Sequence, residues 1–337
     1  MIKTVKDGKE KIRDMVNSSE GWEAFEKELK DVPVRCIVQP LSEPKEPLPR
    51  LKTNTLLDDI LGRGGLTAGK TLELYGEYAS GKTQVIFTLT VEAASEGIVI
   101  FISSEDTFSR ERILQIAKER NKDVEKINTN IYLYEPDSWE EQLAVTSQIP
   151  DPLPAPIKLI VVDSLMCLFR STPEFAGRSR LGKRQELIRY HLRQLKRLAK
   201  THGAIVAFTN QVYDEPVANP FLPKWACQRS AGGHSVWHIG DFRVFLRKAT
   251  GNVRIARLVD NAELPPAERP FQINEKGIDD LSEDQQKLAL EKLQKYEDAQ
   301  AAGQFTKTKK KKTTTEEMVD ETIKEGGDAE ETEGKDV

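Results

Sequence analysis

Between about Leu51 and Val259 the chain alternates short apolar runs with longer stretches that have a helical period. Four runs are apolar almost throughout: Ile98–Ile102, Ile131–Tyr134, Leu159–Val162 and Ala204–Phe208. Such runs are typical of strands buried on both faces, which occur in parallel sheets covered by helices. We therefore predict an α/β fold with a mainly parallel central sheet flanked by helices.

The pattern changes after Gly240. Phe242–Arg247 and Val253–Val259 have the composition of strands, and the Gly251-Asn252 pair between them favours a turn. This pattern predicts antiparallel C-terminal strands that extend the sheet. Two helices are also predicted, a short amphipathic turn over 55–61 and an exposed helix over 285–300.

The 337 residues carry a net charge of −4, but the charges are unevenly placed. A basic run at 307–312 precedes an acidic one at 316–336, so we predict a disordered basic-then-acidic tail at 301–337. Residues 1–50 are predicted to be a short N-terminal helical segment and a linker, in which 32–38 could form an edge strand. The core is then predicted at 51–280 and a C-terminal helix at 281–300.

The three cysteines, Cys36, Cys167 and Cys227, are scattered without the spacing of a metal or redox site. This favours a reducing compartment and argues against a disulfide framework. No apolar run reaches the length of a membrane span, and the polar N-terminus does not resemble a signal peptide. We therefore expect a cytoplasmic protein with no membrane partner.

The strongest chemical signal is the phosphate-binding loop pattern in Gly76-Glu77-Tyr78-Ala79-Ser80-Gly81-Lys82-Thr83. A compact loop that runs into a helix N-terminus directs several backbone N–H groups at phosphate oxygens. Lys82 is predicted to supply an ammonium for the β- and γ-phosphates, and Thr83 a hydroxyl ligand for Mg²⁺. The flanks agree with this interpretation, because 71–75 is predicted as a strand and 84–95 as a helix.

Polar side chains are predicted at the carboxyl ends of three strands, where open α/β sheets bind ligands. Asp163 ends an apolar strand, as expected of an acid that holds a magnesium-bound water. Glu105 could orient a water for attack on a γ-phosphate, or it could be an ordinary surface glutamate. The amides within 209–211 could sense that phosphate and pass its presence to the next loop.

Adenine is the predicted base. A guanine-specific site needs Asn-Lys-x-Asp after a strand, whereas Asn121-Lys122-Asp123-Val124 has valine in the acidic position and lies in a predicted helix-to-loop stretch. We therefore expect ATP as the nucleotide and Mg²⁺ as its metal ion.

Taken together, these motifs resemble those of the RecA/RadA recombinase family, especially its archaeal and eukaryotic branch. The similarity covers about residues 51 to 280 and keeps the motifs in the family's order. They are Gly-Glu-Tyr-Ala-Ser-Gly-Lys-Thr-Gln at 76–84, Ser-Glu-Asp-Thr-Phe-Ser-Arg-Glu-Arg at 104–112, Val-Asp-Ser at 162–164, Thr-Asn-Gln-Val at 209–212 and Leu-Arg-Lys at 246–248. The resemblance implies a RecA-like ATPase core.

The resemblance also implies roles for single residues. Glu105 matches the catalytic glutamate, which would act beside Lys82 of the phosphate-binding loop. Arg112 matches the arginine that lies against adenine, and Gln211 matches the switch glutamine.

Two further matches imply an active site shared between subunits. His238, which by itself would be a structural histidine, matches a histidine that reaches a neighbouring subunit's phosphate. Asp260 to Pro265 resembles the cap that closes over ATP bound to the adjacent protomer. The predicted nucleotide-binding residues are therefore Gly76, Glu77, Tyr78, Ala79, Ser80, Gly81, Lys82, Thr83, Gln84, Arg112, Gln211, His238, Asp260 and Pro265, with Thr83 and Asp163 as metal ligands and Glu105 and Lys82 as catalytic residues.

Two stretches correspond to the family's DNA-binding loops. The first, 170–185, has five basic residues and one glutamate, which suits a phosphate backbone. The second, 213–233, mixes cations with aromatic residues, which suits single-stranded bases. The basic residues of the helix after the first stretch are either a solvated face or a further DNA contact. The predicted DNA-binding residues are Arg170, Arg178, Arg180, Lys183, Arg184, Lys224, Trp225 and Arg229.

The chain departs from the family's recombinases in several places. Residues 1–50 are too few for a helix-hairpin-helix domain, and they lack a Phe-x-x-Ala polymerisation motif. Asp106 replaces the usual glycine after the catalytic glutamate, and Arg180 stands where a glutamate is common. These departures favour a recombinase paralogue over the main recombinase.

We therefore expect an ATP-dependent DNA-binding protein of homologous recombination and DNA repair. It would be a DNA-dependent ATPase that binds single-stranded DNA and assists a recombinase of the same family, as a homo-oligomer or short filament. One alternative is the strand-exchange recombinase itself, and another is an interaction module that binds ATP without hydrolysing it. The presence of Lys82, Thr83, Glu105 and Asp163 favours hydrolysis over that last alternative.

Overall fold

A computed structural model describes residues 48–62, 64–150, 152–175, 177–214, 227–237, 239–249 and 251–301 of the chain. The predicted N-terminal segment with its linker, and the predicted tail beyond Ala301, lie outside these residues except for 48–50. No helix in the described ranges is long and apolar enough to cross a membrane.

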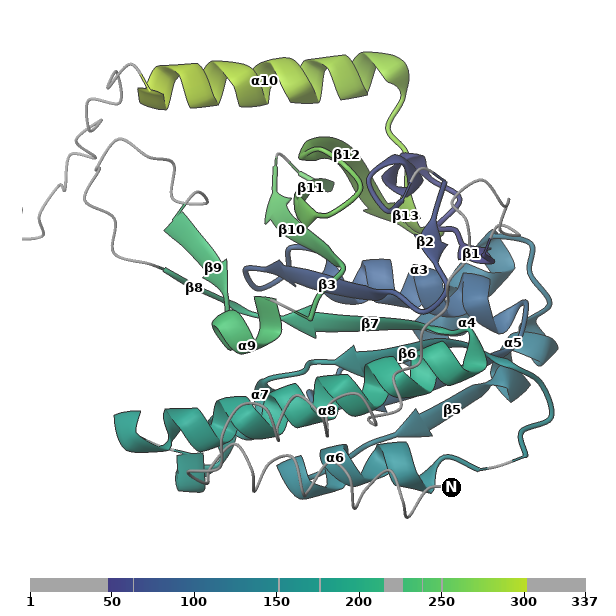
Figure 1. Cartoon of the computed structure of the whole chain (residues 1–337). Helices are drawn as coiled ribbons and strands as arrows, with labels where there is room; N and C mark the ends of the chain where they lie inside the picture. Colours follow the sequence, from purple (N-terminus) through teal and green to yellow (C-terminus); the bar gives the residue numbers. More distant parts are fainter. Residues whose placement is uncertain are drawn as a thin grey trace, which may run out of the picture. The chain divides into compact units, whose positions relative to one another are not determined.

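A nine-stranded sheet forms the centre of the fold (Figure 1). Its strands lie in the order β13 (Gly277–Asp279), β12 (Ala267–Asn274), β11 (Val253–Asn261), β10 (Phe242–Lys248), β3 (Thr71–Gly76), β7 (Ile205–Asn210), β6 (Ile157–Asp163), β4 (Ile98–Ser103) and β5 (Ile131–Tyr134). The six strands from β10 to β5 are mutually parallel, whereas β11, β12 and β13 continue the sheet in antiparallel fashion. The predicted fold class is confirmed.

Helices cover both faces of this sheet (Figure 1). One face packs against α3 (Lys82–Ala94), α4 (Arg110–Glu119) and α5 (Val124–Asn130), and the other against α6 (Trp139–Gln148), α7 (Cys167–Ser171) and α8 (Leu181–His202). Each face of the sheet has its own hydrophobic core: the first core lies under α3, α4 and α5, and the second under α6, α7 and α8. Strand β4 shows why helices are needed on both faces, because Val99 and Phe101 face the first core while Ile98, Ile100 and Ile102 face the second. An apolar run without alternation therefore becomes a strand buried on both faces.

Short polar side chains cap the N-termini of α4, α5 and α6. Ser109, Asp123 and Ser138 each accept a hydrogen bond from a backbone N–H in the first turn of α4, α5 and α6. Asp123 therefore serves as a helix cap, in agreement with the interpretation that the Asn-Lys-Asp-Val stretch belongs to a helix-to-loop connection.

The remaining elements are short, apart from a C-terminal helix. They are β1 (Arg50–Leu51), η1 (Leu56–Asp59), β2 (Leu66–Thr67), η2 (Pro173–Phe175), η3 (Arg178–Arg180), β8 (Val212–Asp214), β9 (Gln228–Ser230), α9 (His234–Trp237) and α10 (Glu283–Ala301). The predicted turn of helix over 55–61 is the single 3₁₀ turn η1, whose start is capped by the Thr55 side chain. Strands β12 and β13 were not predicted, and neither was the β8–β9 hairpin.

One arginine joins three distant parts of the core. Arg120 at the end of α4 donates to Glu92 Oε1 at 2.8 Å and to the carbonyl oxygens of Thr53 (2.8 Å), Lys276 (2.8 Å) and Ile278 (2.6 Å). Both side chains of the ion pair are buried, with 9% of Arg120 and 6% of Glu92 exposed. A planar guanidinium with five donors can satisfy all these acceptors at once.

We expect Arg120→Met to lower the free energy of unfolding by about 3 kcal/mol, because it leaves Glu92 buried with one fewer cation and leaves three carbonyl oxygens without their donor. Arg120→Lys should lose most of that stability as well, since a single ammonium cannot reach all four acceptors. Urea unfolding followed by circular dichroism measures both. The matched control is Arg193→Met on the exposed face of α8, and an equal loss in the control would contradict the assignment.

His191 on α8 is buried among apolar side chains of the second core, and neither ring nitrogen has a hydrogen-bond partner among the described residues. Burial lowers its pKa from 6.5 to about 4. As the pH falls below 6.5, His191 binds a proton in the unfolded chain but stays neutral in the folded protein. The free energy of unfolding therefore decreases between roughly pH 6.5 and 4 and is constant, as far as His191 is concerned, below pH 4.

We expect His191→Leu to remove up to about 3 kcal/mol of this pH-dependent loss while leaving stability at pH 7.5 unchanged or higher. Unfolding titrations at a series of pH values measure it. His202→Leu, at an exposed position of the same helix, is the control and should keep the parent's pH profile. A parent-like profile in His191→Leu would show that His191 is not the group responsible.

Candidate functional site

The loop between β3 and α3 has the backbone that a phosphate-binding loop requires. A Cβ on Gly76 would overlap the carbonyl oxygen of Leu246 on the neighbouring strand β10 and lie 2.7 Å from Ser80 Oγ. Gly81, directly before α3, has φ 101°, a conformation that only glycine adopts without strain, and Ala79 is also left-handed at φ 57°. The two glycines of the motif are thus explained by close approach and by backbone conformation.

Lys82 lies over this loop. Its Nζ donates to the carbonyl oxygens of Gly76 and Glu77, both at 3.0 Å. Burial lowers the pKa of the Lys82 ammonium, and the nearby carboxylates of Asp163 and Glu105 oppose that shift. The ammonium is therefore partly desolvated and electrostatically coupled to the two acids predicted to share its site.

Asp163 ends β6 with 2% of its surface exposed. Thr209 donates its hydroxyl to Asp163 Oδ1, whereas the buried Oδ2 has no hydrogen bond of good geometry within the described residues, although Thr83 is near enough to favour the ionised form. Burial raises the pKa of Asp163. A buried, under-coordinated carboxylate oxygen beside a threonine hydroxyl fits Mg²⁺, which binds hard oxygen ligands and needs few from the protein. The described residues hold no larger cluster of metal-ligating side chains.

Glu105 follows β4 and faces the ends of two neighbouring strands. Its Oε1 accepts from Ser164 Oγ at 2.5 Å and from Gln211 Nε2 at 3.3 Å. Gln211 in turn accepts at Oε1 from Arg170 at 2.8 Å. A continuous chain of hydrogen bonds therefore leads from the predicted catalytic glutamate to the first predicted DNA-binding stretch.

Arg112 is held by two glutamine side chains and by the carbonyl oxygens of Asn274 and Glu275, the last at 3.3 Å from Nη1. It donates from Nε (3.0 Å) and Nη2 (2.9 Å) to Gln84 Oε1, from Nη1 to Gln115 Oε1 (2.6 Å) and from Nη2 to the carbonyl oxygen of Asn274. Burial lowers its pKa. Since Gln84 is part of the first turn of α3, the guanidinium plane is held close to the phosphate-binding loop, which is compatible with the predicted contact with adenine.

The predicted cap, Asp260 to Pro265, lies at the other edge of the sheet from the phosphate-binding loop. Asp260 is opposite Arg243 near the start of β10, and Glu263 forms a 3.2 Å ion pair with Lys70, directly before β3. Gly76 lies at the far end of this six-residue strand, about 20 Å away. The segment therefore cannot cover a nucleotide bound to its own loop.

The first predicted DNA-binding stretch is more helical than the sequence suggests. Lys183 and Arg184 lie in the first turn of α8, and Arg180 immediately precedes this helix in η3. Arg180 donates to the carbonyl oxygen of Glu174 (3.0 Å), and Lys183 lies 3.6 Å from the Glu174 carboxylate. Arg180 and Lys183 are exposed, as is Arg170 at the end of α7, and Arg170 lies close enough to the half-buried Arg184 for their charges to interact.

The second stretch is described only at its base. Its ends form the antiparallel hairpin β8–β9, which carries the exposed Arg229. Lys224 and Trp225 lie outside the described residues, as does His238, and the side chain of Arg178 is likewise outside the description. For these four side chains the assignments stay predictions.

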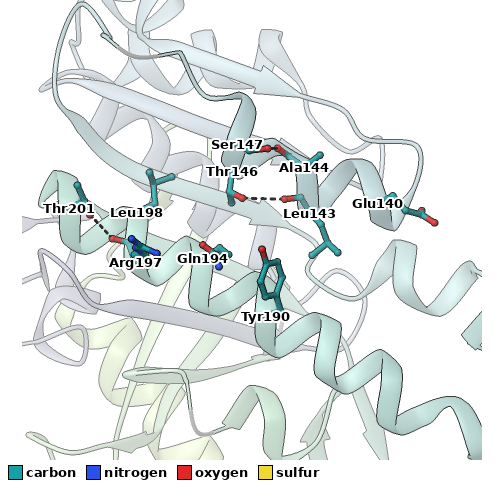
Figure 2. Close-up of a pocket in the computed structure, with 10 residues that line it drawn as sticks. All are labelled: Glu140, Leu143, Ala144, Thr146, Ser147, Tyr190, Gln194, Arg197, Leu198 and Thr201. Atoms are coloured by element: carbon teal, nitrogen blue, oxygen red, sulfur yellow. Dashed lines mark hydrogen bonds between the residues drawn. The ribbon is translucent and has the colours of Figure 1, made fainter. Parts of the chain in front are cut away.

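A groove between α6 and α8 is separate from this site (Figure 2). It contains none of the predicted site residues and is lined by side chains such as Leu143, Tyr190 and Arg197. The hydroxyls of Thr146 and Thr201 donate to carbonyl oxygens of their own helices, at 3.2 and 3.1 Å. Both threonine hydroxyls of the groove are thus hydrogen-bonded within their own helices. The candidate functional site is therefore at the carboxyl ends of the strands and not in this groove.

Sequence reasoning missed a buried polar network beneath the site. Glu73, in the middle of β3, accepts from Arg243 Nε at 2.9 Å and from Asn210 Nδ2 at 3.0 Å. The Arg243 guanidinium also lies over the rings of Tyr75 and Trp237, 5.6 and 5.4 Å from their centroids. A charged residue inside each of two predicted strands, 71–75 and 242–247, was the available signal, since such charges are rarely buried without a partner.

Comparison with known proteins agrees with this architecture. A sequence model of the Rad51 family matches residues 48–281. The chain is 38% identical over 232 residues to the DNA repair and recombination protein RadA of Aeropyrum pernix, covering 66% of this chain and 70% of that protein. It is 37% identical over 235 residues to the meiotic recombination protein DMC1 of Saccharomyces cerevisiae, covering 67% and 70%. The chain therefore belongs to the Rad51 family.

Proposed function

We propose that this protein is a DNA-dependent ATPase of homologous recombination and DNA repair, which binds single-stranded DNA and assists a recombinase of its own family. The observation that carries the proposal is the hydrogen-bonded chain from Glu105 through Gln211 to Arg170. It joins the side chain best placed to act on a γ-phosphate with a basic surface suited to a nucleic-acid backbone.

In this proposal the triphosphate of ATP binds the loop from Gly76 to Thr83. Phosphate oxygens replace the two carbonyl oxygens that Lys82 contacts, which gives the partly desolvated ammonium a stronger partner. Thr83 and Asp163 would hold Mg²⁺, which supplies positive charge at the phosphate oxygens. Glu105 orients the attacking water and accepts its proton, so that the γ-phosphate leaves as inorganic phosphate and ADP remains.

The position of the cap supports a site shared between copies. The segment from Asp260 to Pro265 lies at the N-terminal end of β3, whereas the phosphate-binding loop follows the C-terminal end of that strand. The segment could therefore contact only a nucleotide bound by another protomer. This arrangement supports the proposal of a homo-oligomer or short filament with ATP at each interface. A recombinase of the same family could offer an equivalent surface.

Strand exchange by the protein itself is the second candidate, and the similarity to RadA and DMC1 favours it. Asp106 favours the paralogue. Its backbone has φ 51°, a conformation that is unstrained for the family's usual glycine but strained for an aspartate. The chain therefore has backbone strain and an additional negative charge at the residue next to Glu105. An assay for strand exchange with homologous oligonucleotides separates the two candidates.

We expect Glu105→Gln to keep ATP binding but to lower turnover with single-stranded DNA by roughly 10²-fold or more, because the amide cannot accept the proton of water. Lys82→Ala should instead abolish tight ATP binding. Phosphate release and equilibrium binding of ATP measure the two effects. Glu119→Gln, the same change at an exposed position of α4, should behave like the parent. Unchanged turnover in Glu105→Gln would refute the catalytic role of Glu105. If the parent protein itself hydrolyses no ATP, the alternative of an interaction module that binds ATP without hydrolysing it is favoured.

Replacing Arg178 and Arg180 by Gln should weaken DNA binding almost equally for all sequences, because phosphate contacts carry no base information. The slope of log affinity against log salt should become shallower by about 1.4, the value for two phosphate contacts to a single strand. Fluorescence anisotropy with labelled oligonucleotides at several salt concentrations measures the slope. Lys118 and Lys126, both exposed on the α4–α5 side, provide a double control of equal charge. A slope identical to the parent's would place the DNA elsewhere.

A further inference from the structure

The orientation of the Gln211 amide is determined by its neighbours. Its Oε1 accepts from the Arg170 guanidinium at 2.8 Å, and its Nε2 donates to the Glu105 carboxylate at 3.3 Å. The opposite orientation would set donor against donor and acceptor against acceptor. Gln211 therefore links Arg170 to Glu105 through two hydrogen bonds of defined direction.

This arrangement restrains Glu105. A carboxylate oxygen offers two lone pairs, and on Oε1 they are taken by Ser164 Oγ and Gln211 Nε2. Both hydrogen bonds also fix the carboxylate in one direction. A glutamate held in this way has fewer free acceptor sites for a water than one released from Gln211.

Arg170 is suited to leave Gln211 for a stronger partner. It is exposed, and its partner in this contact is a neutral amide oxygen. Arg184 lies close enough for the two positive charges to interact, and its buried Nε has no hydrogen-bond partner in the described part of the chain. Within that same part, neither guanidinium makes an ion pair with a carboxylate. A phosphate would relieve the repulsion and bind both arginines.

We propose that Arg170 is a positioning residue that restrains Gln211 and Glu105 until a phosphate of single-stranded DNA takes its guanidinium. Binding of the phosphate ends the hydrogen bond between Arg170 and Gln211, and Gln211 then releases Glu105 Oε1. The exchange favours the phosphate because an ionic acceptor binds a guanidinium more strongly than a neutral amide does. This inference deepens the proposed function and rests on it, since it explains how DNA would stimulate ATP turnover at the same site.

The test is ATP turnover of Arg170→Met without DNA. The methionine keeps much of the length of the side chain but cannot donate, so kcat without DNA should rise about fivefold. The KM for ATP should stay unchanged, because Arg170 touches Gln211 and not the phosphate-binding loop. The further stimulation by oligodeoxythymidylate should shrink by the same factor. Lys118→Met, which removes an exposed positive charge on α4, should keep the parent's kcat.

An Arg170→Met kcat without DNA equal to the parent's would overturn the inference, and so would a rise in KM in place of kcat. Failure of this inference and failure of the proposed function can be told apart. If DNA does not stimulate the parent, the proposed function fails, while the DNA-free kcat of Arg170→Met still decides the role of Arg170.

Inorganic phosphate at the same phosphate concentration should not stimulate the parent, because it lacks the neighbouring phosphates that engage the rest of the basic surface. Equal stimulation by inorganic phosphate would overturn DNA as the releasing ligand.

Discussion

A buried ion pair in the middle of the sheet constrains the rest of this structure. Glu73 on β3 and Arg243 on β10 are direct neighbours in the parallel register, with 0% and 9% of their side chains exposed. Two charges at such a position stabilise the fold only when their geometry is good and their remaining hydrogen-bonding groups are satisfied. A shift of one residue between β3 and β10 would separate them and leave the two charges on opposite faces of the sheet. The pair therefore specifies how the strand that carries the phosphate-binding loop is placed in the sheet.

The same network continues toward the functional site. Asn210, at the end of β7, donates to Glu73 and to the carbonyl oxygen of Ala231, and its Oδ1 accepts from the backbone N–H of Gln211 at 2.9 Å. The backbone of Gln211 is thus anchored on the buried side, while its side chain lies on the exposed side between Glu105 and Arg170. A rigid support beneath an exposed polar chain lets the side chain change partners without movement of the strand. This division fits a residue that communicates between two ligands.

Much of the fold and of the candidate site could be predicted from local patterns. Strands such as β4 and β7 were recognised because burial on both faces leaves a short run with hardly any polar residue. The apolar run of β5 was expected to be buried in the same way, but β5 is the edge strand of the sheet and is only half-buried, with Leu133 exposed. The loop from Gly76 to Thr83 was recognised because its chemistry is contiguous in the chain.

Strand β12 was missed since Pro270 interrupts its pattern. That proline is tolerated because β13 pairs only with 272–274, so no outer strand requires an N–H from Pro270.

The sequence by itself thus determined the class of fold, the nucleotide loop and the acids at the strand ends, because each depends on residues that are neighbours in the chain. Only the tertiary structure decided that Glu73 meets Arg243, 170 residues away, and that Gln211 joins Glu105 to Arg170 across 106 and 41 residues. It also decided that the segment from Asp260 to Pro265 faces away from its own nucleotide loop. Local periodicity reports whether a side chain is buried, but the identity of its partner depends on strand order and register, and these are set by the packing of the whole sheet.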